Sequence, residues 1–435
     1  MIAPISTTRS DRAATAFRVG LFGNLGSGNI GNDCSMEAVL RYLRADHPDV
    51  IVDAMCGGAA TVRDRYGLSA IPLFWYQKYE QQTSGVTSVA LKVLGKGIDV
   101  FRTASWVRRH DVVIVPGMGV LEASLPLRPW GFPYAMLLLC ASGRLFRTKV
   151  ALVSVGAGVI NQRLTRWLFT SAARLSFYRS YRNVGSRDAM RQRGLDTAHD
   201  HVYPDLAFAL PAPLAEPGDP QTVCVGVMAY HGSNDDRGHG DRIYSAYVGA
   251  MKGFVRWLVD DGRSVRLVVG DTNGSDDRVV EEILADLRES RPGLDPARAA
   301  AQPVANLADV MRAMQPAGSV VAIRFHNVLA ALKLCKPTIA ISYSPKHDAL
   351  MADMGLPEFC CQVGTLEVDL LINLFKELQS HSAQLRQLLT ERDETSEKLL
   401  KSQFAELSAV LFSAAGRRIP RNPRLGTSQQ MSDSR

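Results

Sequence analysis

Two groups of polar side chains follow apolar segments in the second half of the sequence. Arg324 and His326 follow "SVVAI", and Tyr343 and Lys346 follow "KPTIAIS". Arginine can hold a carboxylate or phosphate through two parallel N–H groups, and histidine can donate a proton near neutral pH. Because ligands bind beyond the carboxyl ends of strands in open α/β sheets, the pattern predicts an anion site with a proton donor. The alternative is a structural histidine beside a surface cation.

A glycine- and asparagine-rich loop near the start of the chain is a second candidate. It has the sequence "GNLGSGNIGND", follows the apolar segment "RVGLF" and precedes a helix expected near Asp33. Glycines let backbone N–H groups approach a ligand, and a helix N-terminus favours negative charge. The loop lacks the Lys-Ser/Thr of a P-loop and the glycine spacing of a dinucleotide site. Asn24, Gly26, Asn29 and Asp33 are the candidate contacts; the alternative is a tight turn capped by Asp33.

Further polar residues are expected at strand ends. Gly117 in "VIVPGMG" and Gly156 in "VSVGAG" end two more strands of the first half. The segment "VGSRDAMRQRGL" is predicted to be a short strand followed by a helix, which would place Arg187 at a cleft; the alternative is a surface cation. His231 lies in a His- and Asp-rich segment that matches no known metal spacing. It belongs to a substrate-facing loop or to a solvated one.

Strand-like segments alternate with helical patterns along most of the chain, which predicts parallel sheets covered on both faces. A Pro- and Gly-rich segment interrupts the alternation, so the fold class is α/β with two Rossmann-like, doubly wound domains facing across a cleft. Residues 61–107 show no clear periodicity and are expected to form an inserted loop or lid. The expected divisions are a domain at 17–210, a linker at 211–221, a domain at 222–365, helices at 366–415 and a disordered basic tail at 416–435.

Composition limits the classes of function. The chain has 435 residues, 46% hydrophobic and 21% charged, which is typical of a soluble globular protein. Its net charge is +7, yet no basic run is interleaved with aromatics, so nucleic acid is not an expected partner. Seven irregularly spaced cysteines without a CxxC pair argue against a zinc ribbon and fit a reducing cytoplasm. The N-terminal residues lack an apolar signal core. We expect a cytoplasmic protein, and peripheral contact with the inner membrane face stays open.

Three segments together resemble the polysaccharide pyruvyl transferase family. They are "GNLGSGNIGND"; "VGSRDAMRQRGL" with "VYPDLAFAL"; and "IRFHNVLAALKLCKPTIAISYSPKHDALMADMGL", the most specific of the three. The resemblance runs from about Val19 to about Leu356. The chain departs from the family pattern where Asn32-Asp33 shifts the first acidic position, where "PGMG" replaces a glycine triplet, and where Cys335-Lys336 replaces the glycine before Pro337.

The resemblance implies a glycosyltransferase-B-like fold and an enzyme that needs no metal and no cofactor beyond its co-substrate, phosphoenolpyruvate. The product would be a pyruvate ketal on a sugar of a cell-surface polysaccharide or its lipid-linked precursor, as in exopolysaccharide biosynthesis. The alternatives are a nucleotide-sugar-dependent glycosyltransferase of the same shape and a non-catalytic glycan-binding subunit. The oligomeric state is left open.

The resemblance also assigns roles to residues. His326 would be the general acid, and Asp205 or Asp33 the base for the sugar hydroxyl. Arg324 and Arg187 would hold the donor. Lys346 and Tyr343 would assist them in the second domain. The acceptor site is predicted from the loops themselves, because they carry few charges and offer amide and backbone N–H groups that suit neutral sugar hydroxyls. The acceptor is expected to bind mainly to the first domain, and its candidate contacts are Asn24, Gly26, Asn29, Asp33, Gly117, Gly156 and, from the second domain, His231.

Overall fold

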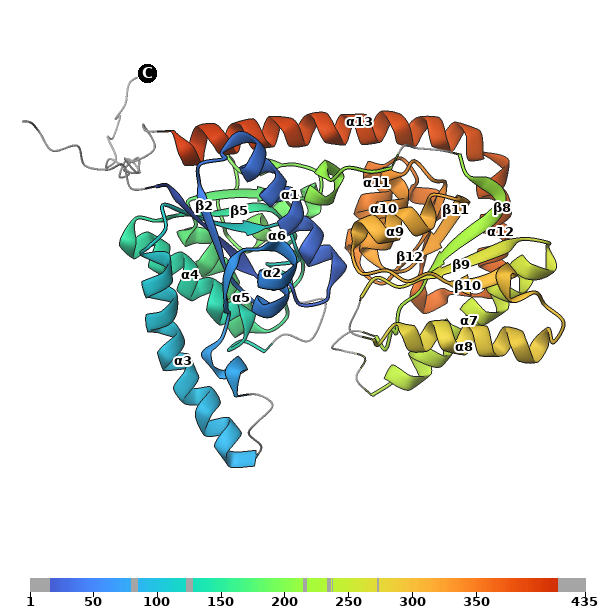
Figure 1. Ribbon diagram of the computed structural model, residues 1–435, viewed down its shortest axis with the longest axis horizontal. Helices are drawn as coiled ribbons and strands as arrows, with labels where there is room; N and C mark the ends of the chain where they lie inside the picture. The colour runs from blue at the N-terminus through green and yellow to red at the C-terminus, as the bar shows by residue number, and fades with distance from the viewer. Residues whose placement is uncertain are drawn as a thin grey trace, which may run out of the picture.

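The protein consists of two parallel-sheet α/β domains, shown in the computed structural model of Figure 1. This confirms the predicted fold class. The structure describes residues 16–79, 85–122, 128–213, 217–232, 236, 238–271 and 274–413, without the side chains of 85–88 and 90. The predicted basic tail therefore lies outside the described residues. In the described chain, the first sheet has the strand order β3-β2-β1-β4-β5-β6-β7 and the second β10-β9-β8-β11-β12-β13.

The elements of the N-terminal domain are β1 (Arg18–Gly23), α1 (Ile30–Asp46), β2 (Ile51–Cys56), α2 (Ala59–Tyr66), β3 (Ser69–Pro72), α3 (Gly85–Val107), β4 (Val112–Pro116), α4 (Phe132–Phe146), β5 (Lys149–Val155), α5 (Arg163–Leu175), β6 (Tyr178–Tyr181), α6 (Val184–Gln192) and β7 (His201–Val202). A short 3-10 helix, η2 (Leu206–Ala209), precedes the connection to the second domain.

The elements of the C-terminal domain are β8 (Asp219–Gly226), α7 (Gly240–Asp260), β9 (Ser264–Val268), α8 (Asp277–Ser290), β10 (Ala299–Ala301), α9 (Leu307–Met314), β11 (Ala317–Ala322), α10 (Phe325–Lys333), β12 (Thr338–Ser342), α11 (Pro345–Asp353) and β13 (Cys360–Gln362). Two further helices follow, α12 (Val368–Ser380) and α13 (Ser382–Leu407).

Three inner strands, β4, β11 and β12, are buried along their whole length. Every residue of β4, β11 and β12 is buried, and these strands are short continuous runs of mostly apolar or small residues. Such runs are typical of parallel strands that helices cover on both faces. The predicted neighbours β11 and β12 do pair in parallel, with Val320 opposite Thr338. Their carboxyl ends therefore meet at one edge of the second sheet.

The predicted boundaries around Arg187 are wrong. The sequence predicts a short strand from Val184, but α5 ends at Leu175 and the strand at this point, β6, occupies Tyr178–Tyr181. The segment from Val184 is the helix α6, and the side chain of Asn183 caps it by accepting from the Ser186 N–H at 2.8 Å. β6 has the sequence YRSY, in which Arg179 and Ser180 interrupt the apolar run that would mark a strand.

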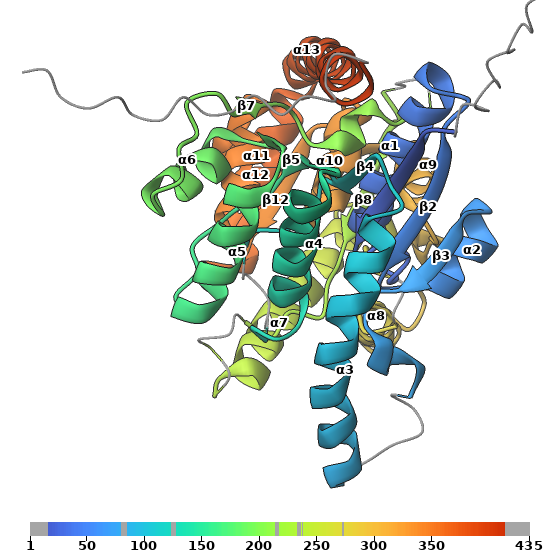
Figure 2. The ribbon, with the colours of Figure 1, turned by 90° about the vertical axis from the view of Figure 1, so that its left-hand side faces the viewer.

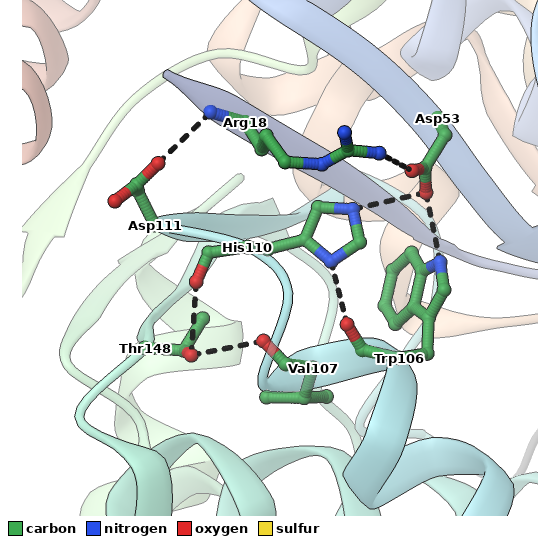
Figure 3. A network of polar contacts seen from close by, with 7 residues as sticks. All are labelled: Arg18, Asp53, Trp106, Val107, His110, Asp111 and Thr148. Atoms are coloured by element: carbon green, nitrogen blue, oxygen red, sulfur yellow. Dashed lines mark hydrogen bonds and ion pairs between the residues drawn. The ribbon is translucent and has the colours of Figure 1, made fainter. Parts of the chain in front are cut away.

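The described part of residues 61–107 is mostly regular rather than an inserted loop, because it contains most of α2, all of β3 and the long helix α3. A polar network centred on Asp53 fixes the end of α3 to the sheet (Figure 3). The Asp53 carboxylate accepts from His110 Nε2 at 3.0 Å, from Trp106 Nε1 at 2.8 Å and from Arg18 at 3.2 Å. A Cβ at Gly20 would lie 2.6 Å from the Trp106 ring, so this position lets the indole pack on β1.

Helix α13 returns from the C-terminal domain and runs along the N-terminal domain (Figure 1). Its Gln403 side chain is fully buried and bonds to the hydroxyls of Ser154 and Ser180, on β5 and β6, at 2.9 Å each. Farther along, Tyr203 donates to Glu406. Helix α13 is therefore bonded to the N-terminal domain, although it follows the C-terminal domain in the sequence.

We expect Gln403→Leu to lower the free energy of unfolding by about 1–3 kcal/mol, because it leaves buried hydroxyl groups short of a partner. Chemical denaturation measures this value. Gln387→Leu is the matched control, since Gln387 is exposed on the same helix and bonds to Glu391 one turn away. Equal stability of the two variants would contradict a structural role for the buried amide.

Candidate active site

A cavity of about 180 Å³ lies between the two domains, at the carboxyl ends of strands from both sheets. Its walls come from the loops after β1, β4 and β6 on one side and the loops after β9, β11 and β12 on the other. The lining residues are Asn24, Asn29, Asn32, Met118, Gly119, Val120, Glu122, Phe132, Arg182, Gly270, Arg324, Phe325, His326, Tyr343 and Lys346. The second-domain cations and aromatic groups predicted from the sequence therefore come together here.

Arg324 is the N-cap residue of α10 and lines the cavity with its side chain largely buried. Its Nε and Nη2 groups donate to the two carboxylate oxygens of Asp276 at 2.8 Å each. This pair fixes the guanidinium, and an oxygen of Asp271 lies 3.7 Å from Nη2. The predicted two-pronged clamp on a donor is thus occupied in part by a carboxylate of the protein.

His326 lies in the first turn of α10 and packs against the first turn of α1 from the other domain. A Cβ at Gly31 would overlap its ring, so glycine there permits the approach. Its Nε2 atom is buried without a hydrogen-bond partner among the described residues. Burial lowers the pKa of His326 to about 4; the Asp205 carboxylate opposes this shift, and the nearby Arg182, Lys346 and Arg324 charges strengthen it. The ring is therefore neutral near pH 7 in the free protein.

Arg182 is a cavity residue that the sequence analysis missed. It follows β6 directly, is 6% exposed and packs its guanidinium 4.8 Å over the Phe325 ring of the other domain. Its nitrogens lie 3.5 Å from a Glu122 oxygen and 3.4 Å from an Asp205 oxygen. The other oxygen of Glu122 lies 3.6 Å from Lys346 Nζ. Glu122 therefore links a cation of each domain across the cavity.

Neither Arg187 nor Asp205 lines this cavity. Arg187 lies on α6, beyond the loop that carries Arg182, because the strand before it ends earlier than predicted. Asp205 caps η2 by accepting from the Ala207 N–H at 3.1 Å and pairs with Arg182. It lines a neighbouring cavity of about 250 Å³, which shares Arg182, Phe325 and Lys346 with the first. Asp205 therefore lies beside Arg182, outside the lining of the first cavity.

The glycine- and asparagine-rich loop contributes Asn24 and Asn29 to the cavity wall. Asn29, not Asp33, caps α1, since its Oδ1 accepts from the N–H groups of Gly31 and Asn32 at 3.1 and 3.2 Å. Asp33 is buried behind the loop and accepts from the Gly26 N–H at 2.6 Å. Burial raises the pKa of Asp33 to about 6. Asp33 and Gly26 therefore shape the loop from behind.

The remaining predicted residues have other surroundings. Gly117 packs against α1, where a Cβ would lie 2.5 Å from the Ser35 hydroxyl. At Gly156 a Cβ would lie 2.6 Å from an Arg182 nitrogen, so this glycine makes room for the buried guanidinium. His231 is half exposed and stacks on Tyr244 at 4.6 Å, away from the cavity lining.

Tyr343 lines the cavity and lies edge-on to the buried His347 at 4.6 Å. His347 Nε2 lies 2.9 Å from the Ile323 carbonyl, which ties the loops after β11 and β12 together.

Among the described residues no cluster of three or more His, Cys, Asp or Glu could hold a metal ion. Within the same residues, every helix is too short or too polar to cross a membrane.

Solved structures define the class of fold. The chain is similar to UDP-GlcNAc 2-epimerase from Methanocaldococcus jannaschii, with a TM-score of 0.56, 9% identity, and coverage of 89% of this chain and 100% of the other. It is also similar to MurG from Acinetobacter baumannii, with a TM-score of 0.52, 12% identity, and coverage of 90% of this chain and 99% of the other. UDP-GlcNAc 2-epimerase from Neisseria meningitidis is similar with a TM-score of 0.54, 10% identity, and coverage of 89% of this chain and 99% of the other. The fold is thus the two-domain, glycosyltransferase-B-like arrangement.

The family follows from the sequence. The family model for polysaccharide pyruvyl transferase matches residues 29–345, which is most of the chain. The protein belongs to the polysaccharide pyruvyl transferase family, as its motifs predicted. No curated protein matches the sequence.

Proposed function

We propose that the protein transfers the enolpyruvyl group of phosphoenolpyruvate to two hydroxyls of a sugar in a cell-surface polysaccharide or its precursor, forming a pyruvate ketal. The observation that carries the proposal is the convergence of Arg182, Arg324, Lys346 and His326 on one small cavity. Phosphoenolpyruvate combines a carboxylate and a phosphate, and clustered guanidinium and ammonium groups suit both.

The cavity of about 180 Å³ suits a donor as small as phosphoenolpyruvate, because sites for drug-sized ligands span about 300–1,000 Å³. A nucleotide sugar would have to extend into the neighbouring cavity of about 250 Å³. Two of the similar structures, UDP-GlcNAc 2-epimerases from Methanocaldococcus jannaschii and Neisseria meningitidis, hold UDP-GlcNAc, so a nucleotide-sugar transferase stays the second candidate. A thermal-shift experiment separates the two, because a ligand stabilises the fold it binds. Stabilisation by UDP-sugars and not by phosphoenolpyruvate would reverse our choice.

The chemistry can be written with the residues of the cavity. The imidazolium of His326 gives its proton to the methylene carbon, and positive charge develops at the adjacent carbon that bears the phosphate oxygen. A sugar hydroxyl bonds to that carbon and loses its proton to a carboxylate. The carbon–oxygen bond to phosphate then breaks and phosphate leaves with the electron pair. The second hydroxyl bonds to the same carbon, closes the ketal and gives its proton to the departing phosphate. Cations around the leaving phosphate supply electrostatic stabilisation.

Glu122 is our proposed acceptor for the hydroxyl proton. Among the described residues that line the cavity, Glu122 alone has a carboxylate side chain. Asp205 lines the neighbouring cavity, and Asp33 lies behind the glycine- and asparagine-rich loop. Its two oxygens already bridge Arg182 and Lys346. A donor carboxylate or phosphate that binds these cations would shift Glu122 toward the sugar.

The affinity for phosphoenolpyruvate should fall as the pH rises. A bound phosphate favours the imidazolium, so it raises the pKa of His326 from its low value of about 4. Binding therefore takes up a proton between the free and bound pKa values, and affinity falls by up to about tenfold per pH unit there. Calorimetry in buffers of different ionisation enthalpy measures the uptake. In the His326→Gln variant, only protonation of the ligand itself should contribute to proton uptake on binding. Unchanged proton uptake in this variant would exclude His326 as the group that is protonated.

The acceptor should contact the asparagines of the first domain. Asn24→Ala should raise the Michaelis constant for the sugar without changing that for the donor, because amide groups suit neutral hydroxyls. Asn29→Asp removes the amide that would contact the acceptor but keeps the side-chain cap on α1. It therefore avoids the loss of about 1 kcal/mol of stability that Asn29→Ala would cause. Steady-state kinetics with both substrates varied gives the two constants. A loss confined to the donor would mean that this loop holds phosphate.

Phosphate release from phosphoenolpyruvate across a panel of acceptor glycans tests the proposed function directly. Release that depends on one acceptor supports it. Its absence with every acceptor, together with binding of a UDP-sugar, would favour the second candidate.

A further inference from the structure

A groove of about 560 Å³ lies between α5 and α6 on the N-terminal domain, outside the cavity described above. Four arginines and a tryptophan line much of it: Arg163, Arg166, Arg174, Arg193 and Trp167. Among the described residues, no carboxylate lies within ion-pair distance of these four guanidinium groups; two of them donate to the backbone carbonyls of Gly194 and Leu121. This differs from the proposed active site, where carboxylates pair the arginines and the lysine. Uncompensated positive charge in a concave surface indicates an anionic partner.

The rim of the groove is apolar as well as basic. Trp167 is 58% exposed and Val159 is 81% exposed, both beside the arginines. The neighbouring helices α3 and α4 also expose large apolar side chains, with Phe101 76% and Leu145 73% exposed. Figure 2 shows α3, α4 and α5 side by side on the face turned toward the viewer. Tryptophan beside arginine is typical of protein surfaces that lie in the headgroup layer of a membrane.

We propose that this face of the N-terminal domain docks on an anionic membrane surface, with lipid phosphates in the arginine groove and Trp167 in the headgroup layer. A second copy of the chain fits less well, because a two-fold dimer through this face would bring the same arginines together. A soluble polyanion would satisfy the charges but would leave the apolar rim in water. The lipid surface satisfies both.

The groove also contacts the loops of the proposed active site. Arg193 Nη1 lies 3.3 Å from the Leu121 carbonyl, and Leu121 immediately precedes Glu122 of the cavity. Leu121 forms a parallel bridge with Ala157, two residues before Val159 on the groove rim. Docking here would hold the acceptor side of the cavity near a membrane-borne saccharide. This consequence rests on the proposed function, whereas the docking itself does not.

Vesicle co-sedimentation tests the docking with the full chain. Wild-type protein should bind vesicles of phosphatidylcholine with phosphatidylglycerol and bind pure phosphatidylcholine much more weakly. Arg163→Gln/Arg166→Gln changes two exposed side chains and should weaken binding by roughly 20- to 30-fold, about fivefold per charge. The matched control, Arg278→Gln/Arg312→Gln, removes the same charge from exposed helices of the other domain and should bind like wild type. Equal weakening in both variants would overturn the location of the docking face.

A second readout locates the contact. Brominated lipids should quench part of the tryptophan fluorescence, and Trp167→Phe should remove most of that quenching. Unchanged quenching in this variant would overturn the orientation.

Two other outcomes would contradict a membrane partner. Binding of inorganic pyrophosphate without any vesicle binding would identify a soluble anion as the partner. A dimer that Arg163→Gln/Arg166→Gln dissociates would identify a second copy of the chain as the partner. Because phosphate release with a soluble acceptor is measured separately, failure of docking and failure of the proposed chemistry give different results.

Discussion

His326→Ala should lower the rate of phosphate release by a factor of about 10² to 10⁴, the usual contribution of a positioned acid. The imidazole acts in the transition state, so donor affinity should change far less than kcat. Its location supports this role: the ring sits at the N-terminus of α10 and lies against Gly31 of the other domain, with Nε2 lacking a partner among the described residues.

His231→Ala is the matched control for this substitution. His231 stacks on Tyr244 outside the cavity lining, so its loss should leave turnover close to wild type. Single-turnover kinetics with phosphate as the readout separates chemistry from binding in both variants. A His326→Ala enzyme with near wild-type kcat would mean that another group donates the proton.

Arg182→Lys should weaken donor binding by about 10- to 100-fold, which corresponds to the loss of a charge-assisted hydrogen bond to a planar anion. Lysine keeps the charge that the buried Asp205 and the partly buried Glu122 require, so the fold should survive. Arg182→Ala would leave those carboxylates without their arginine and cost about 3–5 kcal/mol of stability, which would obscure the kinetic result.

Arg187→Lys is the control, and it also tests the prediction made from the sequence. Arg187 lies on α6, outside the residues that line the cavity, so the donor Michaelis constant should not change. The two constants are to be compared under identical conditions. If Arg187→Lys raised the donor constant and Arg182→Lys did not, the assignment of the first-domain cation would return to Arg187.

The second-domain half of the site could be predicted because its signals are local. Apolar runs mark β11 and β12, and polar residues follow each of them directly, so their meeting required only that the two strands pair. The fold class was predictable for the same reason, since alternating strands and helices dictate parallel sheets. Arg324 held one surprise, because its bidentate partner Asp276 lies 48 residues away in another loop.

The first-domain half was harder to predict. β6 contains Arg179 within a short strand, so its end was placed too late and Arg187 was chosen instead of Arg182. Glu122 carries no motif of its own; it lies near Arg182 only because the loops after β4 and β6 meet in three dimensions. The docking of α13 across two domains depends on pairs such as Ser154 with Gln403, 249 residues apart, and no local pattern announces such a contact.

The return of α13 to the first domain has a mechanical consequence. In the described chain, the polypeptide passes between the domains after η2 and again along α13, which Gln403 and Glu406 fasten to the first domain. Two domains joined at two points can rotate relative to each other mainly about the axis that passes through both connections. Sliding and twisting would stretch one connection or the other. The cavity should therefore open along a single arc that separates Lys346 from Glu122 and Asn29 from Asp271 together, and substrates would enter through one mouth.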